Sequence, residues 1–354
     1  MTGKNEKIIL DVAYQPQVRT ARSTCTIMLD VLIALIPALA AAVWQFGAKV
    51  FVPVLASVCS AVFFEWAYRK LMKKDCRIGD LSACVTGLLL ALTLPPDTPW
   101  WIPVIGSFFA IVVVKQLYGG IGKNFLNPAL AGRAFLLASY ALVLGTFAVP
   151  SSLKAAGVDA ATMATPLSYL YGTDPLPAFF TKSGLFFGSV PGSMGEISTL
   201  AILIGLVYLL VRKVISWRIP VSYAGTVAVL TFLFGHSGFS RLDFMAYNLL
   251  SGGMLFSAVF MATDYATSPV TLPGQLLYGF GCGAITVLIR YFGGFPEGAT
   301  YAVLIMNLCS WAIDKAFRRL PFGSRKKSTL RYESKAERYE RLAEKYREKA
   351  GRDA

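Results

Sequence analysis

Ten apolar runs separated by polar or basic stretches dominate the chain, and they predict membrane-spanning helices. Most of them approach the length of about 20 residues that a helix needs to cross a bilayer. The runs cover residues 27–46, 50–68, 81–94, 100–117, 129–149, 197–211, 219–235, 244–262, 273–292 and 299–313. The pattern therefore predicts an all-α membrane protein with about ten transmembrane helices and a large polar loop between the fifth and the sixth.

The basic residues fall in alternate connections, and this distribution predicts the orientation. Cytoplasmic loops hold an excess of Lys and Arg, so the N-terminus, three basic connections and the C-terminal tail are expected in the cytoplasm. The residues on that side are Lys4, Lys7, Arg19, Arg22, Arg69, Lys70, Lys73, Lys74, Arg77, Lys115, Lys123, Arg133, Arg212, Lys213, Arg218 and those of the tail from Lys315. Only Lys49, Lys154, Lys182, Arg241 and Arg290 remain outside. We expect a multi-pass protein of the cytoplasmic (inner) membrane of a bacterium or archaeon.

Five parts follow from this layout, and the two membrane parts have opposite orientations because each holds an odd number of helices. The parts are a cytoplasmic N-terminal segment (1–26), a first five-helix membrane repeat (27–148), an extracytoplasmic loop (149–195), a second five-helix membrane repeat (196–319) and a charged cytoplasmic tail (320–354). Residues 87–99 are echoed by residues 253–269, which supports an inverted repeat. The alternative is that apolar stretches rich in Gly and Pro look alike without being related.

The third apolar run is too short to span. Its roughly 14 residues reach about 21 Å, against about 30 Å of hydrocarbon, which predicts half of a broken or re-entrant helix. Interrupted segments in matching positions of two halves point to a binding site near the middle of the membrane.

The composition agrees with a membrane protein and excludes several other classes. The chain is 55% hydrophobic and 15% charged, with a mean hydropathy of +0.56, which is too apolar for an ordinary soluble domain. The net charge of +14 lies between apolar runs and in the tail rather than on one basic face, so we expect no nucleic-acid partner. The six cysteines show no C-x-x-C spacing, so no metal or iron–sulfur site is expected.

A few titratable residues are candidates for an ion path. Asp30, Asp97 and Asp264 lie in or beside apolar runs, where a carboxylate is costly unless it has a function. Each of them could instead cap a helix or lie at the interface. Glu65 and Arg69 have the spacing of an ordinary helical ion pair at the cytoplasmic boundary, and His236 is expected to be an interfacial residue.

One string in the predicted outer loop presents two hydroxyl groups and a carboxylate on a segment of small residues. It reads Asp159-Ala-Ala-Thr162-Met-Ala-Thr165-Pro166-Leu167. Pro166 should hold Thr165 in an extended backbone, and we expect its hydroxyl to be accessible to a modifying enzyme. On chemistry alone the signal is weak, because loops rich in Ser, Thr and Ala are usually only solvated.

This string resembles the flavinylation motif D-x-x-[ST]-G-A-T of the family that holds the D subunit of Rnf complexes and the B subunit of the sodium-translocating NADH:quinone reductase. Met163 stands where the motif has glycine. Residues 119–135 and 28–38 are similar to the same family. The resemblance implies that Thr165 carries a covalent FMN, attached through a phosphoester by a flavin transferase that uses FAD. It also allows a second, non-covalent flavin such as riboflavin near the cytoplasmic half of the helices, for which the sequence identifies no residues.

The resemblance further implies a subunit of an ion-translocating oxidoreductase, with length and the short N-terminus favouring the Rnf type. Such a complex couples electron transfer between ferredoxin and NAD to movement of sodium ions or protons. The expected partners are Rnf subunits of the A, B, C, E and G types, and the chain alone should not oxidise NADH. Three alternatives remain: the quinone-reductase B subunit, a flavin-free transporter resembling urea and ammonium channels, and an inert scaffold. For the tail, the alternatives are a solvated helix and a basic segment that binds membrane lipid or a partner subunit.

Overall fold

The computed structural model describes residues 23–74, 78–155, 157–158, 160, 162–172, 175–236, 238–293, 297–317, 340 and 342–344. The chain divides after Asp314 into two compact units, Met1–Asp314 and Lys315–Ala354. The first unit contains the sites discussed below. Of the tail, only four residues from 340 to 344 are described, and of the N-terminal segment only residues 23–26, so the expectations for these two segments lie largely outside the described residues.

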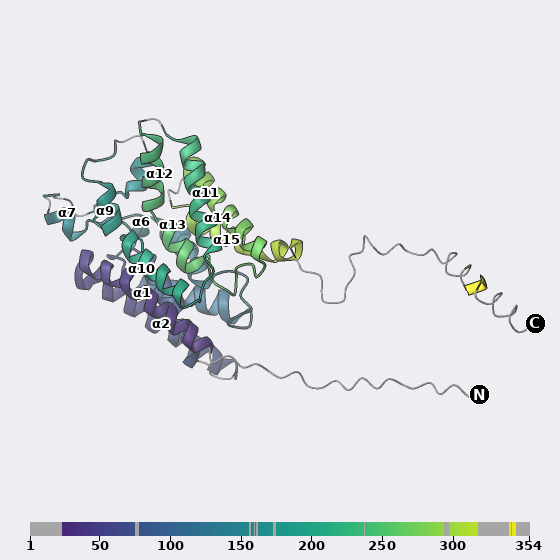
Figure 1. Cartoon of the computed structure of the whole chain (residues 1–354). Coiled ribbons are helices and arrows are strands. Elements are labelled where there is room, and N and C mark those ends of the chain that lie inside the picture. Colours follow the sequence, from purple (N-terminus) through teal and green to yellow (C-terminus); the bar gives the residue numbers. More distant parts are fainter. Residues whose placement is uncertain are drawn as a thin grey trace, which may run out of the picture. The chain divides into compact units, whose positions relative to one another are not determined.

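Each predicted apolar run corresponds to helix in the structure (Figure 1). The elements are α1 (Thr24–Phe46), η1 (Gly47–Val50), α2 (Phe51–Leu71), η2 (Ile78–Asp80), α3 (Ser82–Leu92), α4 (Trp101–Phe108), η3 (Phe109–Gln116), α5 (Pro128–Ser139), α10 (Thr199–Val211), α11 (Arg218–Phe234), α12 (Arg241–Leu250), α13 (Met254–Phe256), η4 (Ser257–Met261), α14 (Leu272–Phe292) and α15 (Ala299–Ala316). The closest packing joins α11 to α14, α2 to α3, and α1 to α10. The expected all-α character is confirmed.

By length and composition, two helical stretches of the described chain are able to cross a membrane alone. They are Thr24–Leu71, which runs through α1, η1 and α2, and Leu272–Phe292. A third is obtained if α12 and the helix that follows it are counted as one bent span. The other apolar helices are shorter, so the number of ten spans and the inverted repeat stay predictions.

The two segments predicted to be interrupted are a short helix and a broken helix. The third run forms α3, whose 11 residues extend about 16 Å. Its proposed counterpart breaks after α12, and the helix resumes at Met254 with a bend of 57°. Gly252 supplies a left-handed φ of +73° in this break, a conformation that side chains other than glycine rarely adopt. Two further segments, η3 and η4, are π-helical, which the sequence pattern did not predict.

The fifth run differs from its prediction. A single helix over 129–149 is wrong, because α5 ends at Ser139. The helix begins at Pro128, after the N-cap residue Asn127, whose side chain accepts from the backbone N–H groups of Ala129 and Leu130. Tyr140, with φ −131° and ψ 43°, leaves the helical region and separates α5 from the short α6 (Ala141–Leu144). The chain then forms β1 (Phe147–Ala148), which pairs antiparallel with β2 (Thr162–Met163). The helical part of this run is therefore only about 18 Å long.

The loop between the two sets of helices contains three short helices, α7 (Ser151–Ala155), α8 (Pro166–Tyr171) and α9 (Lys182–Phe187). It has its own apolar core, in which Leu167 and Leu170 of α8 pack with Phe244 of α12. The backbone N–H of Ser152 donates to Gln45 Oε1 at 3.4 Å, which fixes the start of the loop at the C-terminal end of α1. The loop is thus a folded cap on one end of the helices.

Candidate cofactor and ion sites

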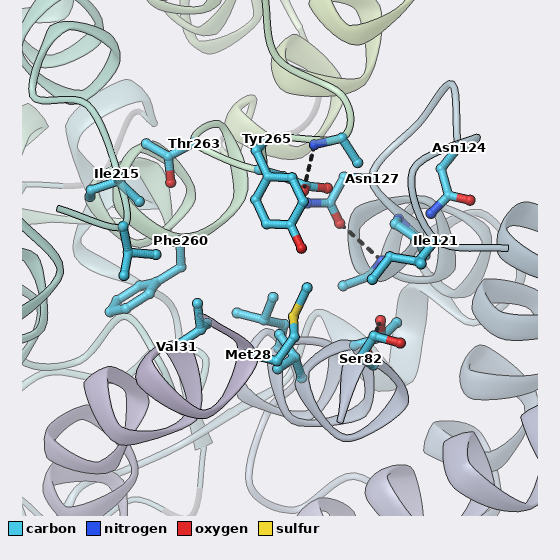
Figure 2. Close-up of a pocket in the computed structure, with 18 of the residues that line it drawn as sticks. Met28, Val31, Ser82, Ile121, Asn124, Asn127, Ile215, Phe260, Thr263 and Tyr265 are labelled. Atoms are coloured by element: carbon cyan, nitrogen blue, oxygen red, sulfur yellow. Dashed lines mark hydrogen bonds between the residues drawn. The ribbon is translucent and has the colours of Figure 1, made fainter. Parts of the chain in front are cut away.

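A pocket lies at the other end of α1, among α1, α3, η3, α10 and η4. It contains about 790 Å³ of space free of protein atoms, part of it open to solvent. Figure 2 shows Met28, Val31, Ile121, Phe260 and Tyr265 around this space. Its walls are mostly apolar, so the pocket favours a ligand with apolar surface.

Two asparagines give the pocket a polar edge. Asn124 and Asn127 lie in the loop between η3 and α5, and they are 8% and 3% exposed, respectively. The Asn127 side chain caps α5 and donates from Nδ2 to the carbonyl oxygen of Met261 at 3.2 Å, while Asn124 Oδ1 is buried without a partner in the described part of the chain. Asp264 also lines the pocket, and its Oδ1 accepts from the backbone N–H of Ala266 at 3.1 Å. A buried acceptor without a donor is expected to be satisfied by a bound group or water.

A buried ionic network forms the wall behind α3. Lys115, which is 1% exposed, donates to Ser82 Oγ at 2.6 Å and to Glu65 Oε2 at 2.8 Å. Glu65 also accepts from Gln116 Nε2 at 2.8 Å and pairs with Arg69 at 3.4 Å. The predicted Glu65–Arg69 pair is confirmed, and Glu65 is completely buried within the protein. Lys115 and Ser82 both line the pocket, so the network brings a positive charge to the pocket wall.

Thr165 lies in the folded loop, at the N-cap of α8. Its φ of −70° and ψ of 154° confirm the extended backbone expected before Pro166. The hydroxyl is 3.1 Å from Ser168 Oγ. The expectation of an accessible Thr165 is wrong for the chain by itself, because the residue is only 5% exposed. Burial of Pro166 and Leu167 in the loop core draws Thr165 inward, whereas Thr162 on β2 is exposed. Asp159 of the motif lies outside the described residues.

The loop and the pocket are at opposite ends of the helices. Met28 contributes to the pocket and Gln45 contacts the loop, and 17 helical residues separate them, which correspond to about 26 Å. With the orientation predicted from the basic residues, the pocket faces the cytoplasm and the loop faces outward.

A second buried cluster surrounds Arg133 between these ends. Arg133, which is 6% exposed, donates to the Glu297 carboxylate and to the carbonyl oxygen of Thr93. Glu196 is 7% exposed, lines the same small cavity and accepts from Ser193 N at 2.7 Å. Arg133 is therefore buried, although the charge distribution along the sequence placed it on the cytoplasmic side.

The other candidate acids have ordinary partners. Asp30 accepts from Tyr208 at 3.0 Å and from Arg212 at 3.1 Å. Asp97 forms an exposed ion pair with Lys49 at 3.2 Å, which supports the interfacial alternative for that residue. His236 stacks against Phe244, with ring centroids 5.9 Å apart. Among the described residues, no group of three or more His, Cys, Asp and Glu residues could hold a metal ion.

Four buried charged residues were not predicted as site residues from the sequence: Lys115, Glu196, Arg290 and Glu297. Arg290 is 2% exposed and donates to the backbone and side-chain oxygens of Asn248, which also accepts from Tyr171 of α8. Each of these residues is charged and stands in or next to an apolar run, a signal that in the sequence indicates only topology. Their common burial depends on contacts between residues far apart in the sequence.

Comparison with known proteins gives similarity over about nine-tenths of the chain. The sequence profile of the NQR2, RnfD, RnfE family matches residues 11–323. The D subunit of the Na(+)-translocating ferredoxin:NAD(+) oxidoreductase complex of Acetobacterium woodii is 44% identical over 92% of this chain and 98% of its own length. The D subunit of the proton-translocating complex of Clostridium ljungdahlii is 40% identical over 91% of this chain and 98% of its length. The D subunit of the ion-translocating oxidoreductase complex of Escherichia coli is 34% identical over 90% of this chain and all of its own length.

Proposed function

The chain belongs to the NQR2, RnfD, RnfE family, and from this premise we propose that it is the membrane-embedded D subunit of an Rnf-type complex. The complex would couple electron transfer between ferredoxin and NAD to the movement of sodium ions or protons across the cytoplasmic membrane. The observation that carries the proposal is the match of nearly the whole chain to D subunits of such complexes, at 34% to 44% identity. The neighbouring subunits would supply the electron donors and acceptors that this chain lacks.

Thr165 is the proposed attachment point of a covalent FMN. A phosphoester needs a hydroxyl oxygen, and a flavin transferase would move the FMN moiety from FAD to this oxygen with release of AMP. Because Thr165 is 5% exposed and α8 is anchored by Leu167 and Leu170, the segment must open for the transferase to reach it. The protein's contribution is the position and the electrostatic surroundings of the flavin, which then carries electrons.

The pocket at the opposite end of α1 is the proposed place of the non-covalent flavin. Its apolar walls would cover the ring system, and its polar groups would recognise the heteroatoms of the ring edge. Asn124 and Asn127 offer amide groups, and Lys115 offers an ammonium group. The unsatisfied Oδ1 of Asn124 supports a bound ligand with a hydrogen-bond donor at this edge.

The covalent flavin is tested with Thr165→Val, which keeps the shape of the side chain and removes the hydroxyl. We expect in-gel flavin fluorescence of the denatured band to be lost when the chain is expressed with its flavin transferase, together with the coupled activity of the complex. Thr162→Val is the matched control, since Thr162 is a motif residue with an exposed hydroxyl and should retain most of the fluorescence. A Thr165→Val band as fluorescent as the parent would show that another group is the acceptor.

The pocket flavin is measured in the same preparations by extracting the native protein and quantifying the released flavin. Thr165→Val should still release it, because its proposed site is at the other end of the helices. Asn124→Leu should lower the released flavin at least several-fold without changing the in-gel fluorescence. If both variants lose the same flavin, the assignment of two separate flavin sites is wrong.

A further inference from the structure

A small cavity lies where α3 ends and where the broken helix resumes at α13. It contains about 290 Å³ of space free of protein atoms, part of it open to solvent, and its lining includes Thr93, Ser193, Glu196, Gly253, Glu297 and Thr300. Two of its oxygen atoms, Ser193 Oγ and Glu297 Oε1, are buried and have no hydrogen-bond partner in the described part of the chain. Ser193 is only 1% exposed. In the described part of the chain, Glu297 Oε1 thus lacks a hydrogen-bond donor, and Arg133 Nε, a buried atom of another lining residue, lacks an acceptor.

The charges around the cavity are also unequally distributed. Arg133 pairs with Glu297, while no Lys or Arg of the described chain lies within ion-pairing distance of Glu196. Arg290 is the next cation, and it interacts electrostatically with both carboxylates, but its guanidinium donates to oxygens of Asn248 and Ser251. Two carboxylates therefore face one guanidinium that is in direct contact with only one of them.

The backbone leaves room for the Glu196 carboxyl group. A Cβ atom on Gly192 would lie 2.9 Å from Glu196 Oε1, and a Cβ atom on Gly253 would lie 2.9 Å from Oε2. Both distances are shorter than real contacts, so a side chain at either position would displace the carboxyl group from its place between the two chain segments. The carboxyl group thus lies against the break in the second interrupted helix.

An ionised carboxylate buried without a cation costs several kcal/mol, and such a group normally takes up a proton instead. When two carboxyl groups share one site, the first proton is bound far more tightly than the second. A protonated Glu196 would also supply the missing O–H donor for an acceptor in the cavity. We propose that Glu196 and Glu297 hold one exchangeable proton in this cavity, which makes it a proton-binding site of the chain. Its role in ion movement rests on the proposed function, whereas the binding of the proton does not.

The proton is detected by infrared spectroscopy of the full chain in lipid nanodiscs, which contain no other protein chain of the complex. We expect the C=O band of about one protonated carboxylic acid per chain near neutral pH, because two carboxyl groups that share one site bind the first proton tightly. The band should shift in D₂O and be lost at high pH. Glu196→Gln should lose this band. Glu297→Gln should lose it as well, because Arg133 is then free to neutralise Glu196. The second variant keeps the test valid if the first does not fold.

Asp30→Asn is the matched control. Asp30 is 8% exposed, close to the 7% of Glu196, but it is paired with Arg212 and Tyr208, so the band should persist in that variant. Absence of the band from the parent, or its persistence in both glutamine variants, would overturn the proposal. Loss of the band when sodium replaces choline at constant pH would assign the cavity to sodium instead of the proton. Thr165→Val should keep the band, so a failed flavin assignment and a failed proton site give different results.

Discussion

The buried pair of Glu65 and Lys115 predicts how much unfolding free energy is lost when either residue is replaced. The loss depends on how many other polar partners the remaining residue keeps. Glu65→Gln removes the carboxylate that is paired with Lys115, and the lysine, 1% exposed, keeps only Ser82 and a neutral amide. Removing one member of a buried pair costs about 3–5 kcal/mol, because the other charge stays buried without compensation. Lys115→Met should cost less, about 1–3 kcal/mol, since Glu65 retains Arg69 and Gln116.

The double variant should be less destabilised than the sum of the two single variants. The interaction energy of the cycle is expected to be about 2 kcal/mol or more, because the double variant leaves neither charge of the pair behind. Tryptophan fluorescence during denaturation by SDS in mixed micelles would give the four unfolding free energies. Additivity within about 0.5 kcal/mol would refute the reasoning, since the two side chains would then not depend on each other.

Two other predictions concern helix packing and orientation. Gly205→Ala should destabilise the chain by about 1–3 kcal/mol, because the new Cβ would lie 2.5 Å from the carbonyl oxygen of Ala34. Gly225→Ala on α11 is the control, because nothing lies within 4 Å of the new Cβ. The better helix propensity of alanine should stabilise that variant by up to about 1 kcal/mol. Equal effects of the two substitutions in the same unfolding assay would contradict the packing argument. Lys154→Cys on α7 and Lys74→Cys after α2, both exposed and placed in a cysteine-free chain, should react with a membrane-impermeant thiol reagent from opposite sides. Same-side labelling would disprove the predicted orientation.

The hydrophobic pattern is sufficient to predict where helices occur, because long apolar runs have few alternatives. It is also sufficient for the short third segment, whose length shows directly in the sequence. It fails for residues 140–149, where Tyr140 leaves the helical region although the run remains apolar. No feature of a single run indicates that the chain turns there to pair β1 with β2.

The candidate sites are less predictable, because each depends on contacts across the fold. Asn124 and Asn127 belong to a stretch that is similar to the family, but the pocket that they share with Met28 and Tyr265 arises only from the packing of distant helices. Likewise, 164 residues separate Arg133 from Glu297. The extended backbone at Thr165 follows from Pro166, a local effect, whereas its burial comes from the packing of α8 on α12, a tertiary effect.

In the π-helical segment η3, the number of residues decides which way the side chains point, as much as the residue types do. Lys115 and Gln116 are consecutive, and both donate to the same carboxylate, although successive side chains of a regular α-helix point about 100° apart. The wider turn, closed by bonds from i to i+5, holds one residue more than an α-helical turn and brings both side chains to Glu65. Deleting a single residue from this segment would change the helical register. Lys115 would then rotate away from the pocket, even if every remaining side chain were kept.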